Sequence, residues 1–343
     1  MKKLLIFITV ALFLNISCKK IIFGEDEASK SPIKNFDYLW EEVDKKYSFF
    51  ELKGIDWQEI RTRYREKIYS GMTEDSLFRV LGAMLNELRD DHTNLVSPFN
   101  IQIYNVELRH KPNFNSRTIQ EFYTNKDPYY TGSFYHSFLN DGQIGYIRYS
   151  SFMNAVSEDD LDFVLTRYKD TKGLVLDLRS NGGGMIVVIP QILSRFVDKR
   201  TLVAYSRTRN GENHSDFSDY QEYYLNPSDN VLYTEKPVMV LTDRGSYSAT
   251  TMFSLLTKAL PNVTLVGDTT GGGGGLPNGG QLPNGWTYRF SISQISDLNK
   301  NIYAEDGVPP DIYAEFDWND LSKDEILDRA VEEILKEDLK YSK

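Results

Sequence analysis

Cysteine is almost absent from this sequence of 343 residues, which contains one, Cys18. A chain with one cysteine has no internal disulfide, so its stability must come from a hydrophobic core. The sequence also lacks the cysteine and histidine spacings of metal sites. The glycine run 271–275 has no Lys-Ser or Lys-Thr after it, which argues against a nucleotide-binding P-loop. We therefore expect neither a metal nor another cofactor.

Basic residues are also fewer than acidic ones in this sequence. The chain has 39 Lys and Arg residues against 49 Asp and Glu residues, for a formal net charge of −10 at pH 7. Removal of residues 1–17, which include two lysines, would bring the net charge to about −12. Such a charge argues against a nucleic-acid partner and against broad adhesion to anionic lipids.

The apolar run near the N-terminus is too short to cross a bilayer. Residues 4–14 are apolar and follow a Met-Lys-Lys start, which is the pattern of a secretory signal peptide. The four residues before Cys18 (LNIS) are similar to a loose lipobox. We predict a signal peptide over residues 1–17, lipidation at Cys18 and a polar tether over residues 18–34. The protein would then be exported and lipid-anchored in the cell envelope, on the periplasmic or outer-membrane face. The alternative is an incidental cysteine in a signal peptide that is cleaved elsewhere.

Helical spacing of apolar residues dominates residues 35–88. Three stripes recur every three or four positions, and the segment Asp56–Glu59 (DWQE) is typical of a capping box. We predict three helices in an N-terminal helical domain over residues 35–95. Residues 96–140, rich in Tyr, Phe, Asn and Pro, predict a β-rich connector, and residues 141–338 predict an α/β core.

Strand and helix patterns alternate after residue 142. Short runs rich in β-branched and aliphatic residues predict strands at 144–149, 173–178, 238–241 and 264–266. Helical patterns predict a helix capped by Ser157, one over 185–196, one after Ser248 and a last one that opens at Ser322. This alternation predicts an α/β fold.

Two of the predicted strand–turn–helix segments have turns suited to chemistry. Strand 173–178 runs into Arg179–Gly184 (RSNGGG), where glycines let the backbone approach a ligand and direct N–H groups at it. Strand 238–241 runs into a turn that contains Ser246 and Ser248. A hydroxyl residue between a strand and a helix stands beside the N–H groups of the helix N-terminus, where a nucleophile is well placed. Each turn by itself is more typical of an ordinary connection in an α/β sheet.

Together, these two segments and a third resemble the C-terminal-processing, or tail-specific, serine peptidases. Asp177–Gly184 is similar to the family's DLR-x-N-x-GG segment, Ser246–Ala249 to its S-x-S-A segment, and Gly307–Ile312 to its GV-x-PDI segment. The resemblance covers residues 35–335 and implies an N-terminal three-helix unit packed on an α/β core of the ClpP/crotonase-like type. Many members carry a PDZ module. Residues 96–140 are too few for one and lack a glycine-rich carboxylate loop, so we predict that the module is absent.

The resemblance implies that Ser248, the second serine of S-x-S-A, is the nucleophile. Ser246 is the nearby competitor, and a helix N-cap is the alternative role for Ser248. Most members use a lysine that follows the serine as the base. In this chain that place falls within residues 271–275, where no lysine occurs, and Lys258 is too close to Ser248 along the same predicted helix.

Histidine is the remaining candidate base, because it titrates near neutral pH. His92 lies in Leu88–Thr93 (LRDDHT), which matches the L-x-D-x-HT segment of the tricorn-like, histidine-using branch of the family. The alternative is an exposed histidine at a helix end. The same branch places a glutamate shortly before GV-x-PD, which implies Glu305 as the carboxylate that orients the histidine, with Asp306 as its rival.

The family pattern further implies an oxyanion hole formed by the backbone N–H groups of Gly183 and Ala249. Which of the three glycines at 182–184 directs its N–H inward is open at this point. Gly272 and Gly273 stand where the family has its lysine turn, and we expect them to border the substrate cleft and let an extended peptide approach. A flexible surface loop without contacts is the alternative.

These assignments predict an exported serine peptidase that hydrolyses peptide bonds of exported proteins or peptides through an acyl-enzyme. Its partners would be a peptide or protein substrate and the membrane, reached through the lipid anchor. The alternative is a non-catalytic ligand- or peptide-binding lipoprotein on the same fold. The oligomeric state is left open.

Overall fold

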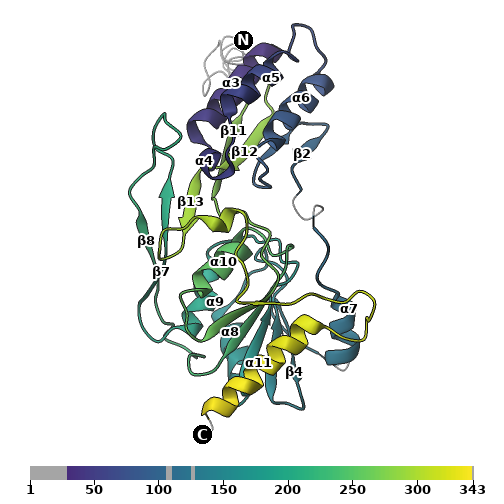
Figure 1. The fold of residues 1–343 in the computed structure, drawn as a ribbon, viewed down its shortest axis with the longest axis vertical. Coiled ribbons are helices and arrows are strands. Elements are labelled where there is room, and N and C mark those ends of the chain that lie inside the picture. The colour runs from purple at the N-terminus through teal and green to yellow at the C-terminus, as the bar shows by residue number, and fades with distance from the viewer. Residues whose placement is uncertain (1–28, 106–109, 125–127, 342–343) are drawn as a thin grey trace, which may run out of the picture. The chain divides into compact units, whose positions relative to one another are not determined.

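The computed structural model describes residues 29–105, 110–124 and 128–341 (Figure 1). The predicted signal peptide, the predicted lipidation at Cys18 and residues 18–28 of the tether lie outside these ranges. Within them, no helix combines the length and the apolar character needed to cross a membrane. The described residues form two units, unit 1 and unit 2.

Unit 1 combines three separate stretches of the chain: the residues up to Tyr104, Arg209–Asp216 and Pro277–Ile292. The rest of the chain belongs to unit 2. This division differs from the linear boundaries expected at residues 95 and 140, since two segments from the expected α/β core belong to unit 1. Local patterns do not reveal such a join, because tertiary packing selects strand partners that are distant in sequence.

The helices of unit 1 are α3 (Pro32–Lys46), α4 (Phe50–Lys53), α5 (Trp57–Arg65) and α6 (Glu74–Asn86). The three longer ones confirm the helices predicted from apolar spacing, and α4 is an additional single turn. The predicted cap at Asp56 is confirmed as well, because its carboxylate accepts the N–H of Glu59 at 2.9 Å. Trp40 and Trp57 stack with ring centroids 6.5 Å apart, and each indole N–H donates to the other residue's carbonyl at 3.1 Å. These contacts lock α3 to α5.

A four-stranded antiparallel sheet completes unit 1, in the order β11-β12-β1-β2. Its strands are β1 (Asn94–Val96), β2 (Ile101–Ile103), β11 (Pro277–Gln281) and β12 (Thr287–Ser291). Trp286 and Phe290 from the β11–β12 hairpin are buried in the same apolar cluster as α3, α5 and α6. The hairpin therefore supplies part of the core of unit 1.

Unit 2 is built on a seven-stranded sheet in the order β14-β10-β9-β6-β5-β4-β3. Neighbours from β14 to β5 are parallel, and β4 and β3 are antiparallel. The strands are β3 (Tyr129–Thr131), β4 (Phe134–Leu139), β5 (Ile144–Arg148), β6 (Gly173–Asp177), β9 (Val238–Thr242), β10 (Val263–Gly267) and β14 (Ile312–Tyr313). The four strands predicted from the sequence are confirmed as β5, β6, β9 and β10.

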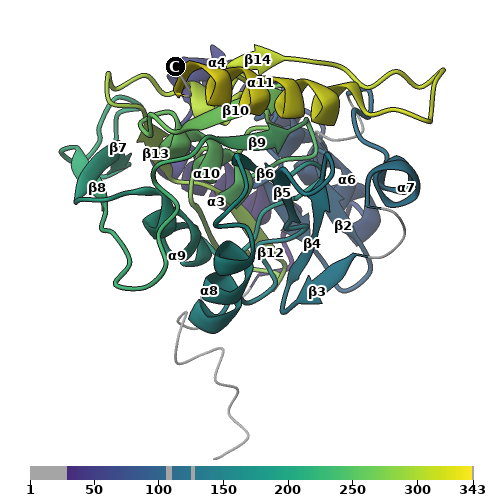
Figure 2. The same ribbon diagram turned by 90° about the horizontal axis from the view of Figure 1, so that it is seen from below.

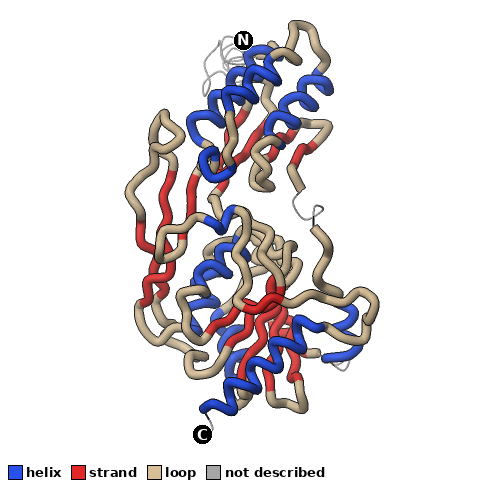
Figure 3. The backbone as a smooth tube through the Cα atoms, in the orientation of Figure 1, coloured by secondary structure: helices blue, strands red, loops and turns tan. Residues whose placement is uncertain are grey.

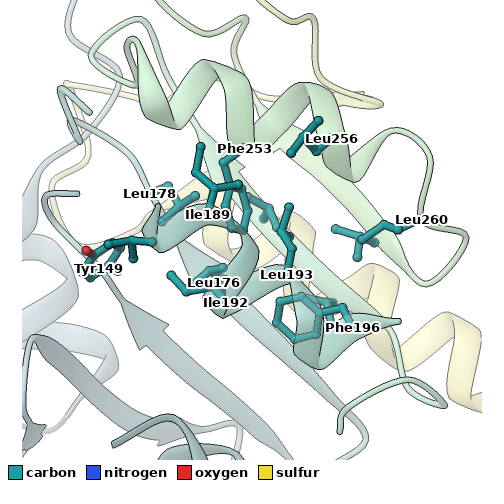
Figure 4. Close-up of a cluster of buried hydrophobic side chains, with 14 of the residues drawn as sticks. Tyr149, Leu176, Leu178, Ile189, Ile192, Leu193, Phe196, Phe253, Leu256 and Leu260 are labelled. Carbon is teal, nitrogen blue, oxygen red and sulfur yellow. The ribbon is translucent and has the colours of Figure 1, made fainter. Parts of the chain in front are cut away.

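Helices cover both faces of this sheet (Figures 2 and 3). One face packs against α8 (Glu158–Arg167), α9 (Val188–Leu193) and α10 (Ala249–Thr257), and the other against α11 (Glu325–Tyr341). Alternate residues of a strand point to opposite faces. Leu176 of β6 therefore joins the first core, beside Ile189 and Phe253 (Figure 4), and Val175 joins the second.

Unit 2 also contains a smaller sheet and several short helical turns. A three-stranded antiparallel sheet has the order β13-β7-β8, with β7 (Thr201–Thr208), β8 (Gln221–Leu225) and β13 (Ser293–Ser296). Short helical turns are α7 (Ser116–Thr118), η2 (Ile119–Tyr123), η3 (Ser194–Phe196) and η4 (Tyr303–Glu305). Within the region expected as a β-rich connector, β3 and β4 extend the main sheet of unit 2.

Two helix boundaries differ from the predictions. The helix expected over 185–196 is α9, which begins only at Val188, because Pro190 has no N–H to bond back to residue 186. The last helix does not open at Ser322. Asp324 caps it instead, since its carboxylate accepts the N–H of Leu327 at 2.9 Å.

Asp324 also takes part in a buried charge cluster. The Arg179 side chain is fully buried and donates to Asp324 at 2.8 Å and to Asp177 at 2.7 Å. The hydroxyl of Tyr146 donates to Asp177 at 2.8 Å. Burial by itself would raise the pKa of Asp177, but the adjacent Arg179 guanidinium outweighs it and holds that pKa below its usual range. The cluster ties the end of β6 to the start of α11.

We predict that Asp324→Ala lowers the free energy of unfolding by about 3–5 kcal/mol, because it leaves Arg179 with an unbalanced buried charge. Urea denaturation followed by circular dichroism would measure this loss. The matched control is Asp320→Ala in the same loop, whose ion pair with Lys323 is exposed and screened by solvent, so its loss should change the free energy of unfolding far less. Equal losses for the two variants would contradict the prediction.

Candidate functional site

The two turns singled out in the sequence lie side by side at one edge of the unit 2 sheet. β6 and β9 are parallel neighbours, so their carboxyl ends meet at that edge. Directly after β6, the N–H of Leu178 donates to the carbonyl of Leu241 in β9 at 3.0 Å. Farther along, the N–H of Tyr247 donates to the carbonyl of Asn181 at 3.0 Å. The prediction that the two segments act together is consistent with this arrangement.

Asn181 organises the first turn from its centre. Its side chain is fully buried, and its amide group donates to the carbonyl of Tyr149 at 2.9 Å. Its side-chain oxygen accepts the N–H groups of Gly183 at 3.0 Å and of Phe152 at 3.3 Å. A buried amide that donates one hydrogen bond and accepts two in this way holds the loop in one conformation.

Gly183 makes the closest approach to the second turn. Its φ of +91° favours glycine, and a Cβ atom there would lie 2.6 Å from the carbonyl oxygen of Tyr247. The same atom would lie 2.9 Å from the Cβ of Ser248 and 2.9 Å from the nitrogen of Ala249. Glycine is therefore required at this position for the backbone to lie against the candidate nucleophile.

The neighbouring glycines face elsewhere. A Cβ at Gly182 would meet open space, and one at Gly184 would meet the backbone of Phe152 and Met153. Among the three, Gly183 is thus the residue that packs against Ser248. Its N–H donates to the side chain of Asn181, so in this structure that donor is already engaged.

Ser248 has an unusual backbone at the start of α10, with φ 57° and ψ −114°. Such a conformation costs a non-glycine residue on the order of 1–3 kcal/mol and is concentrated at functional sites. Its N–H donates to the carbonyl of Gly272 at 2.9 Å, and its side chain makes no capping hydrogen bond to the helix. The alternative role of Ser248 as a side-chain N-cap is therefore wrong.

Ser246 has a structural role. Its side chain is fully buried, and its hydroxyl donates to the carbonyl of Leu178 at 2.9 Å and accepts the N–H of Asp243 at 3.1 Å. Burial raises the pKa of Asp243, whose carboxylate also accepts the N–H of Ser180 at 2.7 Å. Ser246 and Asp243 thus join the two turns beneath Ser248.

The glycine run 271–275 is buried and hydrogen-bonded, so the alternative of a flexible surface loop without contacts is wrong. Gly272 forms a parallel bridge with Tyr247, the residue before the candidate nucleophile. A Cβ at Gly272 would lie 2.2 Å from the carbonyl oxygen of Glu305, and one at Gly273 would lie 2.5 Å from the Tyr247 ring. These glycines therefore hold the nucleophile turn through close backbone contact.

Glu305 lies against the same run. It is buried, in η4, and its carboxylate accepts the N–H of Gly274 at 3.0 Å. Its rival Asp306 is exposed. Lys258 is at the far end of α10 from Ser248, roughly 15 Å along the helix axis. It forms an ion pair with Asp311 at 2.7 Å, so it does not serve as a base for Ser248.

His92 belongs to unit 1, whereas Ser248 and Glu305 belong to unit 2. His92 is 6% exposed, which excludes the alternative of an exposed helix-end histidine. Its carbonyl accepts the Nε–H of Arg289 at 3.2 Å, and its Nδ1 is 3.5 Å from the hydroxyl of Ser291. The pairing of His92 with Ser248 stays a prediction.

The other histidines are committed to different contacts or lie at the surface. Burial lowers the pKa of His136 to about 4, and its ring bonds to the hydroxyl of Tyr168 at 2.8 Å. His214 bonds to Asp44 at 2.9 Å in unit 1. His110 is exposed. In the residues that the structure describes, no three His, Cys, Asp or Glu side chains gather into a metal site.

Sequence reasoning missed several residues that support this site. Asn181 is inside the motif that drew attention to the first turn, and a buried polar residue between a strand and glycines is a signal for it. Asp243, directly after β9, offers a similar signal. Ser291 could not be found, because it approaches His92 from a strand 199 positions away in the chain.

Comparison with known proteins adds two family matches. The model described as peptidase family S41 matches residues 143–314, and that of the tricorn protease C1 domain matches residues 30–86. The carboxy-terminal processing protease CtpB of Bacillus subtilis is 29% identical over 170 residues. That alignment covers 49% of this chain and 33% of CtpB, so the match spans about a third of the relative's length.

Solved structures share the fold over nearly the whole chain. A candidate peptidase from Parabacteroides merdae has a TM-score of 0.85 and 39% identity, with 90% of this chain and 98% of that chain covered. Mature CPAF has a TM-score of 0.65 at 13% identity, with 89% and 96% covered, and this likeness concerns the fold alone. The expected fold class, with N-terminal helices and an α/β core, is confirmed.

We predict that Ser246→Ala lowers the free energy of unfolding by about 1–3 kcal/mol, because the buried N–H of Asp243 and carbonyl of Leu178 lose a partner. Thermal and urea denaturation would measure the change. Ser322→Ala is the matched control, since Ser322 is exposed and bonds only locally to Asp320, and its effect should stay within about 0.5 kcal/mol. A Ser246→Ala protein as stable as this control would refute the structural role.

Proposed function

Because this chain belongs to the S41 family of serine peptidases, we propose that it cleaves peptide bonds with Ser248 as the nucleophile and His92 as the base. The observation that carries this proposal is the backbone of Ser248, held at φ 57° and ψ −114° at the head of α10. Strain of this kind at a strand-to-helix turn presents a side chain at the edge of a sheet. The alternative of a non-catalytic binding lipoprotein is not favoured by the comparisons.

The proposed reaction passes through an acyl-enzyme. The Oγ of Ser248 attacks the carbonyl carbon of the peptide while His92 takes the hydroxyl proton. When the tetrahedral intermediate collapses, the C–N bond breaks and His92 returns the proton to the leaving amine. A water molecule then attacks the ester with His92 again as base, and the acid product and free serine are released.

Two backbone N–H groups are candidates for the oxyanion hole. The N–H of Ala249, at the first position of α10, precedes the intrahelical hydrogen-bond ladder and lies at the positive end of the helix dipole. The N–H of Gly183 donates to Asn181, so it would bind an oxyanion by sharing or releasing that bond. Ala249 is therefore the stronger of the two proposed donors.

Glu305 is the carboxylate that we propose to act with His92. Its burial and its bond to Gly274 give it one orientation in unit 2, whereas Asp306 is exposed. A fixed carboxylate can stabilise the protonated histidine through its negative charge, which is part of what the third member of a catalytic triad does.

We propose that an apolar surface beside the glycine turn receives a side chain of the peptide. The backbone of Phe152 pairs with Gly184, so Met153 lies next to the start of the segment Met185–Val187. Met153 is 68% exposed and Val187 is 66% exposed. Exposed apolar residues gathered beside a candidate oxyanion donor suit a substrate with an apolar residue near the scissile bond.

We also propose that the protein is exported and held at a membrane by lipid on Cys18, after cleavage of residues 1–17. The charged start, the apolar segment and the position of the sole cysteine support this proposal. Its substrates would then be exported proteins or peptides.

Ser248→Ala should lower peptide hydrolysis by roughly 10³-fold or more, because no other group supplies the nucleophile. Cleavage of a peptide library and covalent labelling by a fluorophosphonate probe would measure the loss. Circular dichroism would show that the variant is folded, and Ser322→Ala should keep full activity and labelling. A Ser248→Ala protein with the wild-type rate would exclude Ser248 as the nucleophile.

Replacement of Met153 and Val187 by serine should lower kcat/KM for peptides with an apolar residue near the cleaved bond by about tenfold. Peptides with a polar residue at the same position should be affected much less. Phe163→Ser removes another exposed apolar side chain, on α8, and is the matched control. An unchanged preference among the peptides would rule out this surface as the specificity site.

A further inference from the structure

We propose that Asp90 and Ser291 form a hydrogen-bonded relay that positions His92 and fixes its neutral tautomer. The inference rests on the proposed function in one respect, that His92 is the base. All three residues belong to unit 1, so the relay is formed within one unit. Asp90 and Ser291 would act through His92 and would not touch the substrate.

Ser291 links the other two side chains. Its hydroxyl donates to Oδ2 of Asp90 at 2.9 Å, and its oxygen lies 3.5 Å from Nδ1 of His92. All three residues are buried, with 2% of Asp90, none of Ser291 and 6% of His92 exposed. The longer contact is at the upper limit of a hydrogen bond, as is common for catalytic contacts before substrate binds.

Proton counting sets the direction of each bond. An ionised carboxylate only accepts hydrogen bonds, and a hydroxyl has a single proton to donate. Since Ser291 donates that proton to Asp90, its oxygen can only accept from the His92 ring. Nδ1 must then carry hydrogen, and Nε2 of the neutral ring keeps its lone pair. A general base needs that lone pair, so the relay selects the productive tautomer.

The second oxygen of Asp90 holds the backbone of the same histidine. Its Oδ1 accepts the N–H of His92 at 2.8 Å. One carboxylate therefore sets both the main-chain position of His92 and, through Ser291, the direction of its ring. This double contact separates Asp90 from an ordinary loop-closing residue, which would need only the backbone bond.

Strand β12 explains why Ser291 is in place. Its carbonyl accepts the N–H of Ser48 at 3.1 Å and the hydroxyl of Ser48 at 3.2 Å. Two residues earlier in β12, Arg289 donates to the carbonyl of His92 at 3.2 Å. The strand thus contacts His92 at the ring and at the main chain. A buried hydroxyl held in this way keeps its direction without reorganisation during the reaction.

The relay also stabilises the protonated histidine. When His92 takes a proton at Nε2, the positive ring continues to donate from Nδ1 to Ser291, and the negative charge of Asp90 lies just beyond. Both effects favour the charged form and should raise the pKa of His92. Loss of either Asp90 or Ser291 should lower that pKa and move the acid limb of the activity profile to lower pH.

NMR spectroscopy of the full-length wild-type protein tests the tautomer directly. The ¹⁵N chemical shifts of the His92 ring, assigned with a His92→Gln variant, should show hydrogen on Nδ1 in the neutral form. Hydrogen on Nε2 would overturn the relay. This measurement depends on neither catalysis nor the folding of a relay variant.

NMR titration of Ser291→Ala and Asp90→Asn tests the electrostatic part. Each variant should lower the pKa of His92 by about one unit and lower kcat/KM by about tenfold. Ser97→Ala is the matched control, because it removes a buried hydroxyl of unit 1 that bonds to the carbonyl of Asn100 and takes no part in the relay. In this control variant the pKa of His92 should be unchanged. A shift as large as in Ser291→Ala and Asp90→Asn would mean that Asp90 and Ser291 have only a structural role.

The two proposals fail in different ways. If His92→Ala abolishes hydrolysis but the His92 pKa is the same in wild type, Ser291→Ala and Asp90→Asn, the relay is wrong and the proposed function stands. If the pKa shifts as expected but His92→Ala hydrolyses peptides at the wild-type rate, the relay exists and His92 is not the base.

Discussion

The strained backbone of Ser248 is the constraint to which the surrounding structure of unit 2 is fitted. A serine at φ 57° and ψ −114° persists only where neighbouring contacts outweigh its conformational cost. Those contacts come from both sides, with Gly272 accepting its N–H and Asn181 accepting the N–H of the residue before it. Both sides need close backbone approach, which is why a Cβ at Gly183 or Gly272 would collide with neighbouring atoms.

Buried polar groups hold this arrangement together. The side chains of Asn181, Ser246 and Asp243 form hydrogen bonds with backbone groups of the first turn and of the residues next to it. Arg179 pairs with Asp177 at the end of β6 and with Asp324 at the start of α11. Networks of this kind are costly when one member is missing and specific when all members are satisfied. The positions of the site residues in unit 2 are therefore fixed by the buried polar contacts of its folded core.

The proposed chemistry divides between the two units. Unit 2 carries the nucleophile and the backbone donors, and unit 1 carries the histidine with Asp90 and Ser291. Each set is organised by hydrogen bonds within its own unit.

Much of the fold could be predicted because it depends on local patterns. The helices of unit 1 follow from apolar spacing, the caps at Asp56 and Ser157 from side chains that accept a nearby N–H, and four strands of the main sheet from their apolar runs. The start of the last helix was missed because Asp320, Ser322 and Asp324 all have capping chemistry. In the structure Asp324 is the residue that caps this helix, and it also forms an ion pair with Arg179.

The sequence by itself determined the strand–turn–helix segments, the residues with nucleophilic or basic chemistry and the places where glycine is required. Only the tertiary structure decided that Ser246 is buried while Ser248 is strained, and that β11 and β12 belong with the helices of unit 1. It also decided that Ser291 meets His92. Local structure depends on interactions a few residues apart, whereas these outcomes depend on contacts between residues that can be more than two hundred positions apart. Such contacts form only when the whole chain buries its apolar surface together.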